Sequence, residues 1–574
     1  MKRTWKRILA ALLCVVLAAS ALSTAAYAAD GADLRLAIAS DLHFNFPREE
    51  IAGPEIGRID DPLFWYANRR AAMEDESGFI IDAFLRACAA GDCDYVLIAG
   101  DLADSGRSLR EEHEAGAAKL AAFERESGKQ VFVIDGNHDL GAGDSATKMQ
   151  DFKEIYADFG YDRALTVREN DCSYTADLGE KYRLIALDSC DYTKSTEDGM
   201  TLDKLRFVRA EAAKAKQDGR QPIVMMHHTL LDHMPMQRIV SRNFIVRFHR
   251  TTAELFADWG VRVVISGHEH CGDTTVFTSA LGNKIYDFAI TSLTMYPLSY
   301  MTMTFTDDAI RYDSVPVEKL DTDALQSAVR GYSDDQIDAM NADLNAYAKG
   351  FLKKGVEYRL WLSLTLEKMG VKESDLYYGA ANAVFSRLNE LLRMPLYGDD
   401  SLQALGKEYN IDIPDSGYAN AWDLATELVS MHYAGEEHYT LESAEVTLLL
   451  RAVNLILHDD LAQFNDAVLL KGANKLLKKT GGEGIAEELT KLGCRVFGPV
   501  TAGEFFLLAL ASPFLYEFAF DADGVNDNHG TIEGYAVRDP ARNTAGKART
   551  FFAALRVWFE NLLLIVTRCV RLPF

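Results

Sequence analysis

Short apolar runs alternate with amphipathic stretches over the first half of the chain. The runs are rich in Val, Ile and Tyr and are apolar at consecutive positions, which is typical of strands buried on both faces. They cover residues 34–40, 95–100, 130–136, 181–188, 222–228, 261–267 and 285–292. Helical periodicity separates several of them, for example over residues 78–90 and 110–127. This alternation predicts an α/β architecture.

The pattern changes after Pro316, where strand-like runs stop and helical periodicity continues to the end of the chain. The candidate helices cover residues 334–353, 373–393, 422–431, 442–458 and 461–478. We therefore predict an α/β domain over residues 29–316, followed by an all-helical C-terminal region over residues 317–574. That region forms either one bundle or two bundles split near residues 398–420.

Two C-terminal stretches are unusually apolar. Residues 505–520 are interrupted by Pro513 and Glu517 and are shorter than the ~20 residues of a membrane span, so we expect them to be buried in the helical region. In residues 549–571, a stripe roughly 60° wide on a helix with 100° per residue contains Arg549, Arg556, Glu560, Thr567 and Arg571, and the rest is mostly apolar. Such a helix either packs into a helical core or lies on a membrane surface. Peripheral membrane contact through residues 549–571 is thus one prediction for the tail.

The first 28 residues have the features of a signal peptide. A basic start is followed by an apolar stretch, and Ala26 and Ala28 provide the small residues expected before a cleavage site at Ala29. The alternative is an anchor that stays attached. Cleavage predicts an exported protein that is extracellular, bound at the cell surface or periplasmic.

Export makes disulfide bonds chemically accessible. Cys88 with Cys93 and Cys172 with Cys190 are close enough in sequence to pair locally, the second pair across a predicted hairpin. The alternative is that these cysteines pack as small apolar side chains. Because no CxxC pair is present, a cysteine-based zinc site is not expected.

The chain is strongly acidic, with 60 Lys and Arg against 85 Asp and Glu and a formal net charge of −25. Residues 1–28 hold four basic and no acidic side chains, so the mature chain would carry −25 − 4 = −29. Binders of nucleic acids gather positive charge to neutralise phosphates, so general nucleic-acid binding is excluded. A local cationic site, including one made by metal ions, remains compatible with this charge.

Asp, Asn and His residues follow five of the predicted strands. In chain order these segments read Ser40-Asp41-Leu42-His43, Gly100-Asp101-Leu102-Ala103-Asp104, Gly136-Asn137-His138-Asp139, Met226-His227-His228 and Gly267-His268-Glu269-His270. Each segment alone is typical of a turn or a helix N-cap. In open α/β sheets the carboxyl ends of the strands carry the chemistry, so five such segments predict converging ligands. Carboxylate, imidazole and amide oxygen suit first-row divalent or trivalent metals.

These five segments resemble the motifs of the calcineurin-like metallophosphoesterases, whose pattern is DxH, GDxxD, GNH(D/E), H and GHxH. The resemblance covers residues 34–315 and no motif departs from the pattern. It implies a two-sheet αββα sandwich with a dinuclear metal site at the strand ends. It also implies two divalent or mixed-valence metal ions, with Mn, Fe or Zn expected.

The resemblance assigns a role to each residue of the motifs. Asp41, His43 and His270 would hold the first metal. Asn137, His227 and His268 would hold the second metal, and Asp101 would bridge the two. His138 would face the scissile phosphate, with Asp104 or Asp139 orienting its ring.

The chemistry gives an independent reason for these residue types. Two metals about 3.5–4 Å apart can clamp the attacking and the leaving oxygen of a displacement at phosphorus, and they acidify a bound water. The pair also offsets the charge of the phosphate. An acidic protein can therefore bind a small anionic phosphoester.

Several other residues receive weaker or purely structural roles. His228 either contacts substrate or packs, and Tyr296, after the last run, is placed at the rim of the cleft. Glu269 is expected to face solvent and Asp188 to cap a turn. Outside the motifs are His113, His249 and His233, the last close enough in sequence to reach the cleft. Residues 521–529 are acidic but lack the ligand register of an EF-hand, so we interpret them as an acidic loop.

The function expected from the resemblance is hydrolysis of a phosphodiester. An exported core with a helical appendage is similar to bacterial cyclic-nucleotide phosphodiesterases of this superfamily, residues 321–395 being most similar to that appendage. The C-terminal region is longer than the pattern requires, which leaves the substrate open. The alternatives are a phosphomonoesterase or nucleotidase with the same site, and a non-catalytic surface-binding protein on the same fold.

Overall fold

The structure is a computed structural model, and it describes most of the chain between residues 33 and 534. The described residues are 33–49, 71–193, 198–234, 237, 241, 243–363, 366, 371–456, 461, 463–479, 485–521 and 523–534. The expected signal peptide (1–28) and the amphipathic tail (549–571) lie outside the described residues.

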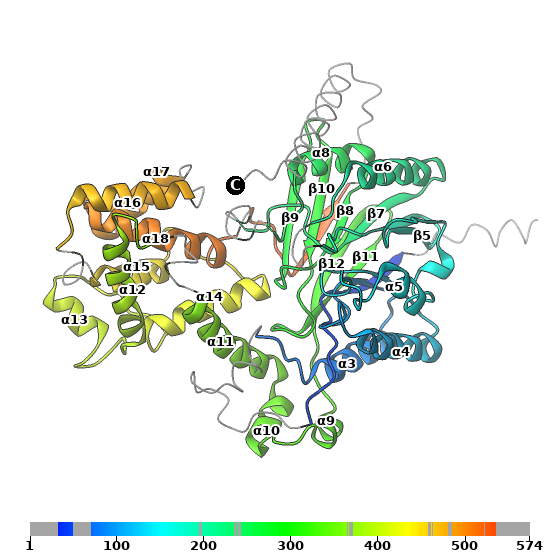
Figure 1. The fold of residues 1–574 in the computed structure, drawn as a ribbon, viewed down its shortest axis with the longest axis horizontal. Helices are drawn as coiled ribbons and strands as arrows, with labels where there is room; N and C mark the ends of the chain where they lie inside the picture. The colour runs from blue at the N-terminus through cyan, green and yellow to red at the C-terminus, as the bar shows by residue number, and fades with distance from the viewer. Residues whose placement is uncertain are drawn as a thin grey trace, which may run out of the picture.

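The first of two β-sheets is built around three parallel strands. β1 (Leu34–Ala39), β2 (Tyr95–Ala99) and β3 (Gln130–Ile134) pair in parallel at one side of the sheet. β11 (Ser299–Phe305), β12 (Ala309–Pro316) and β13 (His529–Glu533) extend it by antiparallel pairing. The order of the six strands is β13-β12-β11-β1-β2-β3 (Figure 1).

The second sheet has seven strands in the order β4-β5-β6-β7-β8-β10-β9. They are β4 (Thr166–Val167), β5 (Tyr174–Leu178), β6 (Tyr182–Leu187), β7 (Gln221–Met226), β8 (Val263–Ser266), β9 (Asp273–Thr278) and β10 (Lys284–Ala289). β6, β7, β8 and β10 are parallel, whereas β4, β5 and β9 pair antiparallel at the edges. Each of the seven apolar runs in the sequence coincides with a strand of one of the sheets.

Helices cover the outer faces of the two sheets. On the side of the first sheet lie α3 (Ser77–Ala90), α4 (Arg110–Ser127) and α5 (Met149–Ile155), followed by the short 3₁₀ helix η1 (Tyr161–Arg163). On the second sheet lie α6 (Leu202–Gln217), which packs on β6 and β7, and α8 (His249–Trp259), which packs on β9 and β10. The predicted αββα sandwich is therefore confirmed.

The region after Pro316 is mostly helical. It contains α9 (Thr322–Ala328), α10 (Asp334–Ala342), α11 (Leu344–Ser363), α12 (Tyr378–Arg393), α13 (Leu402–Glu408), α14 (Ala421–Ala434), α15 (Ala444–Asn454), α16 (Asp466–Lys479), α17 (Ala486–Phe497) and α18 (Ala502–Phe518). Helices α12 to α18 form a separate lobe, here called the helical lobe, at the left of Figure 1. One continuous apolar core contains residues on both sides of residues 398–420.

One predicted helix, over residues 334–353, is divided into α10 and α11. Asp343 separates them because its backbone is extended, with φ −159° and ψ 96°. Its carboxylate accepts a hydrogen bond from the backbone N–H of Ala346 at 2.9 Å. Asp side chains favour such N-terminal caps, so one residue ends α10 and begins α11.

The predicted helical C-terminal region is confirmed except at its end, where the chain returns to the sandwich after α18. β13 adds the outermost strand to the first sheet. Just before it, Asp527 accepts the backbone N–H of Thr274 at 2.7 Å, and Asp523 accepts that of Val276 at 2.8 Å. Thr274 and Val276 belong to β9, an edge strand whose free backbone donors would otherwise invite pairing with another chain. The acidic loop of the sequence thus protects the edge of the second sheet.

Within the described part of the chain, no single helix is both long and apolar enough to cross a membrane. Helices α17 and α18 meet the length and composition requirement only as a pair bent by 119°. Phe506, Leu507 and Leu508 of α18 are nevertheless buried in the core of the helical lobe, as expected for residues 505–520.

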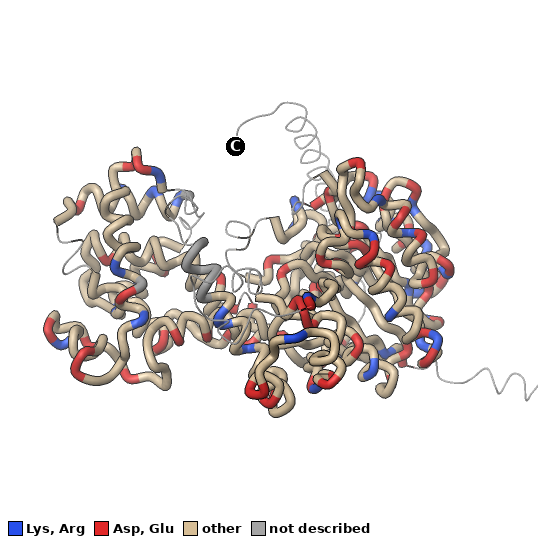
Figure 2. The backbone as a smooth tube through the Cα atoms, turned by 60° about the horizontal axis from the view of Figure 1, so that its bottom comes forward, with Lys and Arg blue, Asp and Glu red and all other residues tan. Residues whose placement is uncertain are grey.

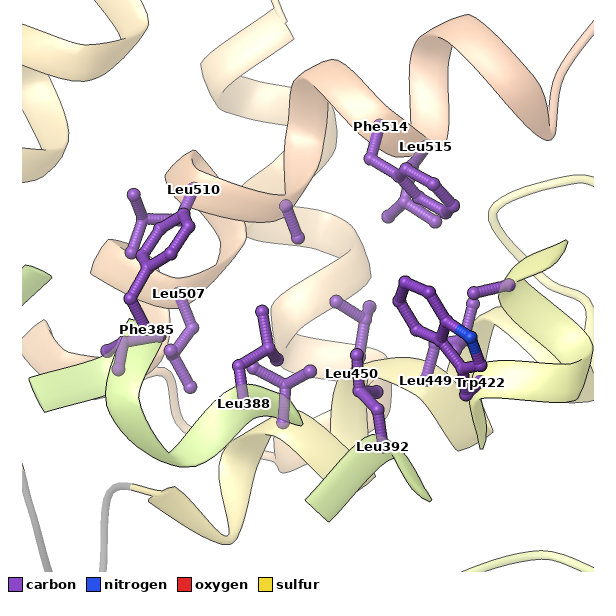
Figure 3. A pocket seen from close by; sticks show the side chains of 14 residues that line it. Phe385, Leu388, Leu392, Trp422, Leu449, Leu450, Leu507, Leu510, Phe514 and Leu515 are labelled. Carbon is purple, nitrogen blue, oxygen red and sulfur yellow. The ribbon is translucent and has the colours of Figure 1, made fainter. Parts of the chain in front are cut away.

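The helical lobe contains an apolar cavity of about 130 Å³ between α12, α14, α15 and α18 (Figure 3). All of its lining side chains are apolar or aromatic, including Leu388, Ala425, Leu450 and Phe514. Cavities of this kind lower stability because their lining loses van der Waals partners. These apolar side chains therefore surround free volume that a larger side chain could occupy.

Filling this cavity is expected to stabilise the protein. Ala425→Leu places extra carbons in the free volume and should raise the free energy of unfolding by ~1 kcal/mol. Ala380→Leu is the matched control, because Ala380 is fully buried in the same core but does not line the cavity. That change should overpack the core and lower stability by ~1–3 kcal/mol. Denaturant unfolding of both variants checks the prediction, and equal destabilisation would contradict it.

Candidate metal centre

The polar segments at the strand ends come from both sheets and meet between them. β1, β2 and β3 end just before Asp41, Asp101 and Asn137, while β7 and β8 end just before His227 and His268. Backbone hydrogen bonds tie the segments to one another, from Asp41 N–H to Gly100 O at 3.1 Å and from Gly267 N–H to His227 O at 2.9 Å. The topology therefore brings together five segments spread over some 230 residues of sequence.

Five of these polar residues have left-handed backbone conformations. The φ angles are 49° at Asp41, 42° at His43, 49° at Asp101, 69° at His268 and 64° at His270. Such conformations are unfavourable for residues other than glycine, and they persist at functional sites where the surroundings hold them in place. Left-handed turns thus place these side chains directly after β1, β2 and β8.

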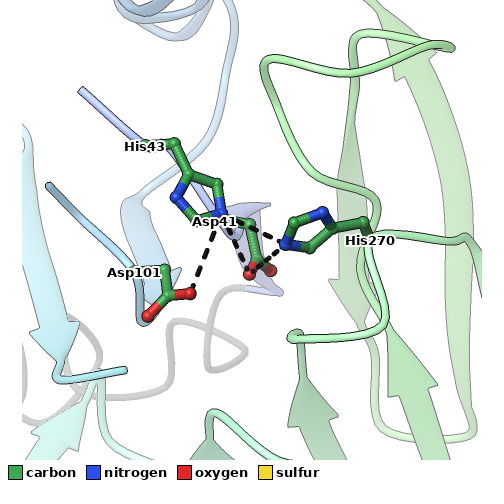
Figure 4. A group of neighbouring side chains, drawn as sticks. All are labelled: Asp41, His43, Asp101 and His270. Atoms are coloured by element: carbon green, nitrogen blue, oxygen red, sulfur yellow. Dashed lines mark hydrogen bonds and ion pairs between the residues drawn. The ribbon is translucent and has the colours of Figure 1, made fainter. Parts of the chain in front are cut away.

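The first group of side chains consists of Asp41, His43, Asp101 and His270 (Figure 4). The Nε2 atoms of His43 and His270 lie 3.1 Å apart. Asp41 Oδ1 is 3.2 Å from His270 Nε2 and 3.8 Å from His43 Nε2, and Asp101 Oδ2 is 3.7 Å from His43 Nε2. Four potential ligand atoms thus face one small volume.

The second group shares Asp101 with the first. Asp101 joins His227 and His268 in a buried cluster, with Asp101 Oδ2 at 3.4 Å from His227 Nε2. Asn137 Oδ1 lies 3.0 Å from the same His227 nitrogen. Because Asp101 belongs to both groups, it has the position of a ligand between two neighbouring ions.

Buried polar atoms without partners test whether metal ions fit here. Asp41 Oδ1, Asp101 Oδ2 and His268 Nε2 are buried and make no hydrogen bond in the described part of the chain. Leaving such groups unpaired in the interior is unfavourable, whereas a metal ion would satisfy all three. The residues therefore fit a pair of metal ions. When bound, two such ions acidify a water molecule and offset the charge of a phosphoryl group.

Burial and charge favour the metal-binding protonation state at three of the ligands. Burial lowers the pKa of His268 well below its usual value, and burial also lowers the pKa of His43. Burial acts to raise the pKa of Asp101, but the neighbouring His227 and His138 outweigh it and hold that pKa well below its usual range. Metals bind neutral imidazole and ionised carboxylate, which are the forms favoured at these three residues.

Hydrogen bonds from neighbouring groups orient the ligands. Ser40 Oγ donates to Asp41 Oδ2 at 2.7 Å, and the backbone N–H of His268 donates to the same oxygen at 3.0 Å. His227 Nδ1 lies 2.9 Å from the carbonyl oxygen of Ala99, which fixes Nδ1 as the donor and leaves Nε2 for a metal. Ser292 Oγ donates to Asp41 O at 2.9 Å. Neither Ser40 nor Ser292 was predicted to support a ligand, and no spacing in the sequence marks Ser292.

His138 lies beside the two groups and is only half-buried. Its Nδ1 is 2.7 Å from the carbonyl oxygen of Asp104, and its backbone N–H donates to Asp101 Oδ1 at 2.8 Å. A carbonyl only accepts, so Nδ1 carries the proton. Asp104 therefore orients the His138 ring through its main-chain carbonyl and not through its carboxylate. The Asp104 carboxylate lies 3.3 Å from His43 Nδ1.

Asp139 supports the loops beside His138. Its carboxylate accepts backbone N–H groups of Leu102, Ala103 and Gly136 at 2.7–3.3 Å. His113 in turn has Nε2 3.0 Å from the Asp139 carbonyl oxygen. Asp139 therefore joins the loops after β2 and β3.

The remaining candidates lie around this centre. His228 is fully buried, with Nδ1 3.0 Å from Ser189 Oγ and its ring 4.5 Å from that of His268, so it packs behind a ligand. Tyr296 is buried under Lys349 of α11. Asp188 accepts the backbone N–H of Cys172 and Cys190, as expected for a cap.

Three further expectations concern Glu269, His233 and the cysteines. Glu269 does not face solvent, because it is half-buried and accepts a hydrogen bond from Gln237. His233 is buried between Asp273 and Asp287, at 2.6 and 3.1 Å. Among the described residues the cysteines of both candidate disulfide pairs are free, and Cys88, Cys172 and Cys190 are buried.

Removing the shared carboxylate should disrupt both metal sites. We expect the wild-type protein to bind two Mn²⁺ ions per chain and Asp101→Ala to lose at least ~100-fold in affinity for both, because changes even outside the ligand shell cost 10–100-fold. Calorimetric titration of metal-free protein measures this. Asp144→Ala removes an exposed acidic group as a control. Retention of both ions by Asp101→Ala would contradict the assignment.

The calcineurin-like phosphoesterase family matches residues 34–272. No curated protein matches the chain. Among solved structures 75 chains match.

Three of these structures illustrate the similarity. A dimetal phosphatase from Danio rerio is 11% identical, covers 50% of this chain and 96% of its own, and has a TM-score of 0.37. A predicted phosphoesterase from Streptococcus pneumoniae is 13% identical, with 50% and 91% covered and a TM-score of 0.20. An NAD nucleotidase from Haemophilus influenzae is 14% identical, with 48% of each chain covered and a TM-score of 0.27.

These identities and TM-scores are low, so the assignment depends on the family match and on the geometry of the centre. The family match spans all five polar segments, up to His270. The buried Asp and His groups have the composition of a dimetal site. Residues 34–272 thus match the calcineurin-like phosphoesterase family, and with these buried Asp and His groups the protein is a metal-dependent phosphoesterase.

Proposed function

We propose that this protein is an exported phosphodiesterase that hydrolyses a small, nucleotide-like diester, with cyclic nucleotides as the first class to test. Hydrolysis would proceed at the dinuclear centre defined by Asp101 and the two ligand groups. Mn, Fe and Zn are the metals that this set of carboxylate, imidazole and amide ligands favours. Export remains a prediction from residues 1–28.

The diester proposal is based on a protein surface beside the metal centre, here called the wall, which is formed by residues 295–297 and helix α11. Met295 Sδ lies 3.0 Å from Nδ1 of the ligand His270, so the segment containing Met295 and Tyr296 borders the centre. Helix α11 packs against this segment, since Asn345 Nδ2 donates to Pro297 O at 2.5 Å and Lys349 Nζ lies 5.6 Å from the Tyr296 ring centroid. A diester has a second substituent on phosphorus, and a wall supplied by α11 gives that substituent a surface to bind.

His138 is the chain's own group for proton transfer in this proposal. Its Nδ1 proton is held by the Asp104 carbonyl, which leaves Nε2 as the atom that exchanges a proton with substrate. A protonated Nε2 would donate to the leaving alkoxide as the ester bond breaks. His138 is also half-exposed, unlike the buried ligands around it.

The acidic surface supports a small substrate rather than a nucleic acid. Lys and Arg are interspersed among Asp and Glu over both the sandwich and the helical lobe (Figure 2). With a formal charge of −25, the chain would repel a long polyanion. A small phosphoester carries little charge and is attracted by the metal ions alone.

The choice between diester and monoester is tested with two chromogenic substrates. We expect kcat/KM for bis(p-nitrophenyl) phosphate to exceed that for p-nitrophenyl phosphate by at least ~10-fold, followed by turnover of cyclic nucleotides. The measurement is steady-state hydrolysis by Mn-loaded protein. A strong preference for the monoester would instead support the phosphomonoesterase or nucleotidase alternative, and hydrolysis of neither substrate would support a binding protein.

Replacing His138 should slow the reaction without removing the metals. His138→Ala is expected to lower kcat by ~10²–10⁴, the usual contribution of general acid–base catalysis. The loss should be smaller for p-nitrophenolate esters than for esters with basic alkoxide leaving groups, because a good leaving group needs less protonation. Metal content is measured in parallel. An unchanged kcat with alkoxide leaving groups would remove His138 from the mechanism.

A further inference from the structure

The C-terminal end of α14 lies directly on the loop that carries two metal ligands. Figure 1 shows α14 running from the helical lobe toward the strands of the sandwich. The backbone N–H of Gly272 donates to Tyr433 O at 3.1 Å. From the returning chain, Asn528 Nδ2 donates to Ala434 O and Gly435 O, both at 2.9 Å. The end of α14 is therefore held between the loop after β8 and the segment before β13.

His432 of α14 is buried at this junction. It is 5% exposed, its Nδ1 lies 2.6 Å from Glu437 Oε1, and its ring is edge-on to that of Phe518 of α18, at 5.4 Å between centroids. The carbonyl of the next residue, Tyr433, accepts the backbone N–H of Gly272, two residues after the ligand His270. His432 thus fixes the turn at the end of α14 that contacts the loop with the metal ligands.

Polar contacts extend the same connection to the loop after β7. Glu269, between His268 and His270, accepts a hydrogen bond from Gln237, ten residues after the ligand His227. In the same region, Ser241 Oγ donates to Glu517 of α18 at 3.1 Å. Loops from two strands of the second sheet are therefore fastened to each other and to the helical lobe.

The backbone of the ligands explains why such support is needed. His268 and His270 have φ angles of 69° and 64°, in the left-handed region that these residues avoid. Residues keep such conformations only when the surrounding structure over-determines them. The hydrogen bond from Gly272 to Tyr433 supplies a restraint that β8 alone does not provide, and His432 and Asn528 hold the end of α14 that makes it.

We propose that His432 and the C-terminal end of α14 are positioning elements of the metal centre, which makes the helical lobe a working part of the phosphoesterase site. They hold residues 268–272 so that His268 and His270 point at the metals. The proposal depends on the metal centre but not on the identity of the substrate. It predicts that changes in the helical lobe alter metal binding from outside the ligand set.

Gly435 allows this contact to be opened from the lobe side. A Cβ at Gly435 would clash with Gly272 O and would lie 2.8 Å from Asp527 Cβ, so Gly435→Ala should push α14 away from the loop. Gly435 also has a left-handed φ of 64° as the C-cap of α14. Gly128→Ala is the matched control, because Gly128 is the left-handed C-cap of α4, with φ 72°, and a Cβ there would meet no atom within 4 Å. Both variants suffer the same backbone strain, and only Gly435→Ala disturbs the loop.

His432 provides a second, independent pair of variants. His432→Ala removes both side-chain contacts, whereas His432→Gln retains a donor and an acceptor and should restore part of the function. His438→Ala is the matched control, because His438 follows the same helix but is exposed, with Nδ1 2.9 Å from Glu436 O. The His432 and His438 variants test the proposal even if Gly435→Ala does not fold.

The readout is calorimetric titration of metal-free protein with Mn²⁺, together with kcat and KM. We expect Gly435→Ala and His432→Ala to bind Mn²⁺ ~10–100-fold more weakly and to lose kcat with little change in KM, as found when groups behind metal ligands are removed. Gly128→Ala and His438→Ala should stay within ~2-fold of wild type, and His432→Gln should lie between.

Wild-type Mn²⁺ affinity and kcat in both folded variants would overturn the proposal. Equal losses in Gly435→Ala and Gly128→Ala would also overturn it, because strain alone would then explain the effect. If wild-type protein itself bound no Mn²⁺, the metal centre would fail rather than the role of α14. Failure of diester hydrolysis with intact Mn²⁺ binding would affect only the proposed substrate.

Discussion

A single buried carboxylate links the parts of this structure. Asp101 Oδ1 accepts the backbone N–H of His138, which fixes the loop after β3, while Oδ2 faces His43 and His227 from the two sheets. An ionised carboxylate in the interior requires compensating positive charge. The metals that the surrounding histidines would hold provide it. The sandwich therefore positions two ligand groups around one shared charge.

Much of the fold could be predicted, because most strands of the sandwich are buried on both faces and show as continuous apolar runs. The strands that escaped prediction lack this signal. β9 and β11 mix Thr and Ser with apolar residues, and β13 is mostly exposed. β13 also pairs with β12 across more than 200 residues of intervening helices. Such pairings depend on tertiary contacts that no local pattern records.

The motif residues were recognisable because their spacing relative to the strands reflects backbone requirements. A Cβ at Gly136 would clash with Asp101 Oδ1, and one at Gly267 would lie 2.5 Å from Asp41 Oδ2, so both glycines allow close approach to a ligand. The supporting residues were not predictable. Ser292, Glu269 and His432 act through partners distant in sequence. Their residue types are common, and only the fold gives them a role.

The helical lobe is inserted between β12 and β13 rather than attached to the end of the domain. Its two connections to the sandwich therefore leave from neighbouring strands of one sheet, β12 ending at Pro316 and β13 beginning at His529. A protein shortened after Pro316 would lose more than a lobe: the first sheet would expose β12, and the second sheet would lose the carboxylates that cover β9. Two bare strand edges invite self-association. Deleting only the helical lobe and rejoining the chain before Asp523 would keep both strand edges covered. The α/β domain therefore includes the segment that follows the lobe, and the lobe is an insertion within it.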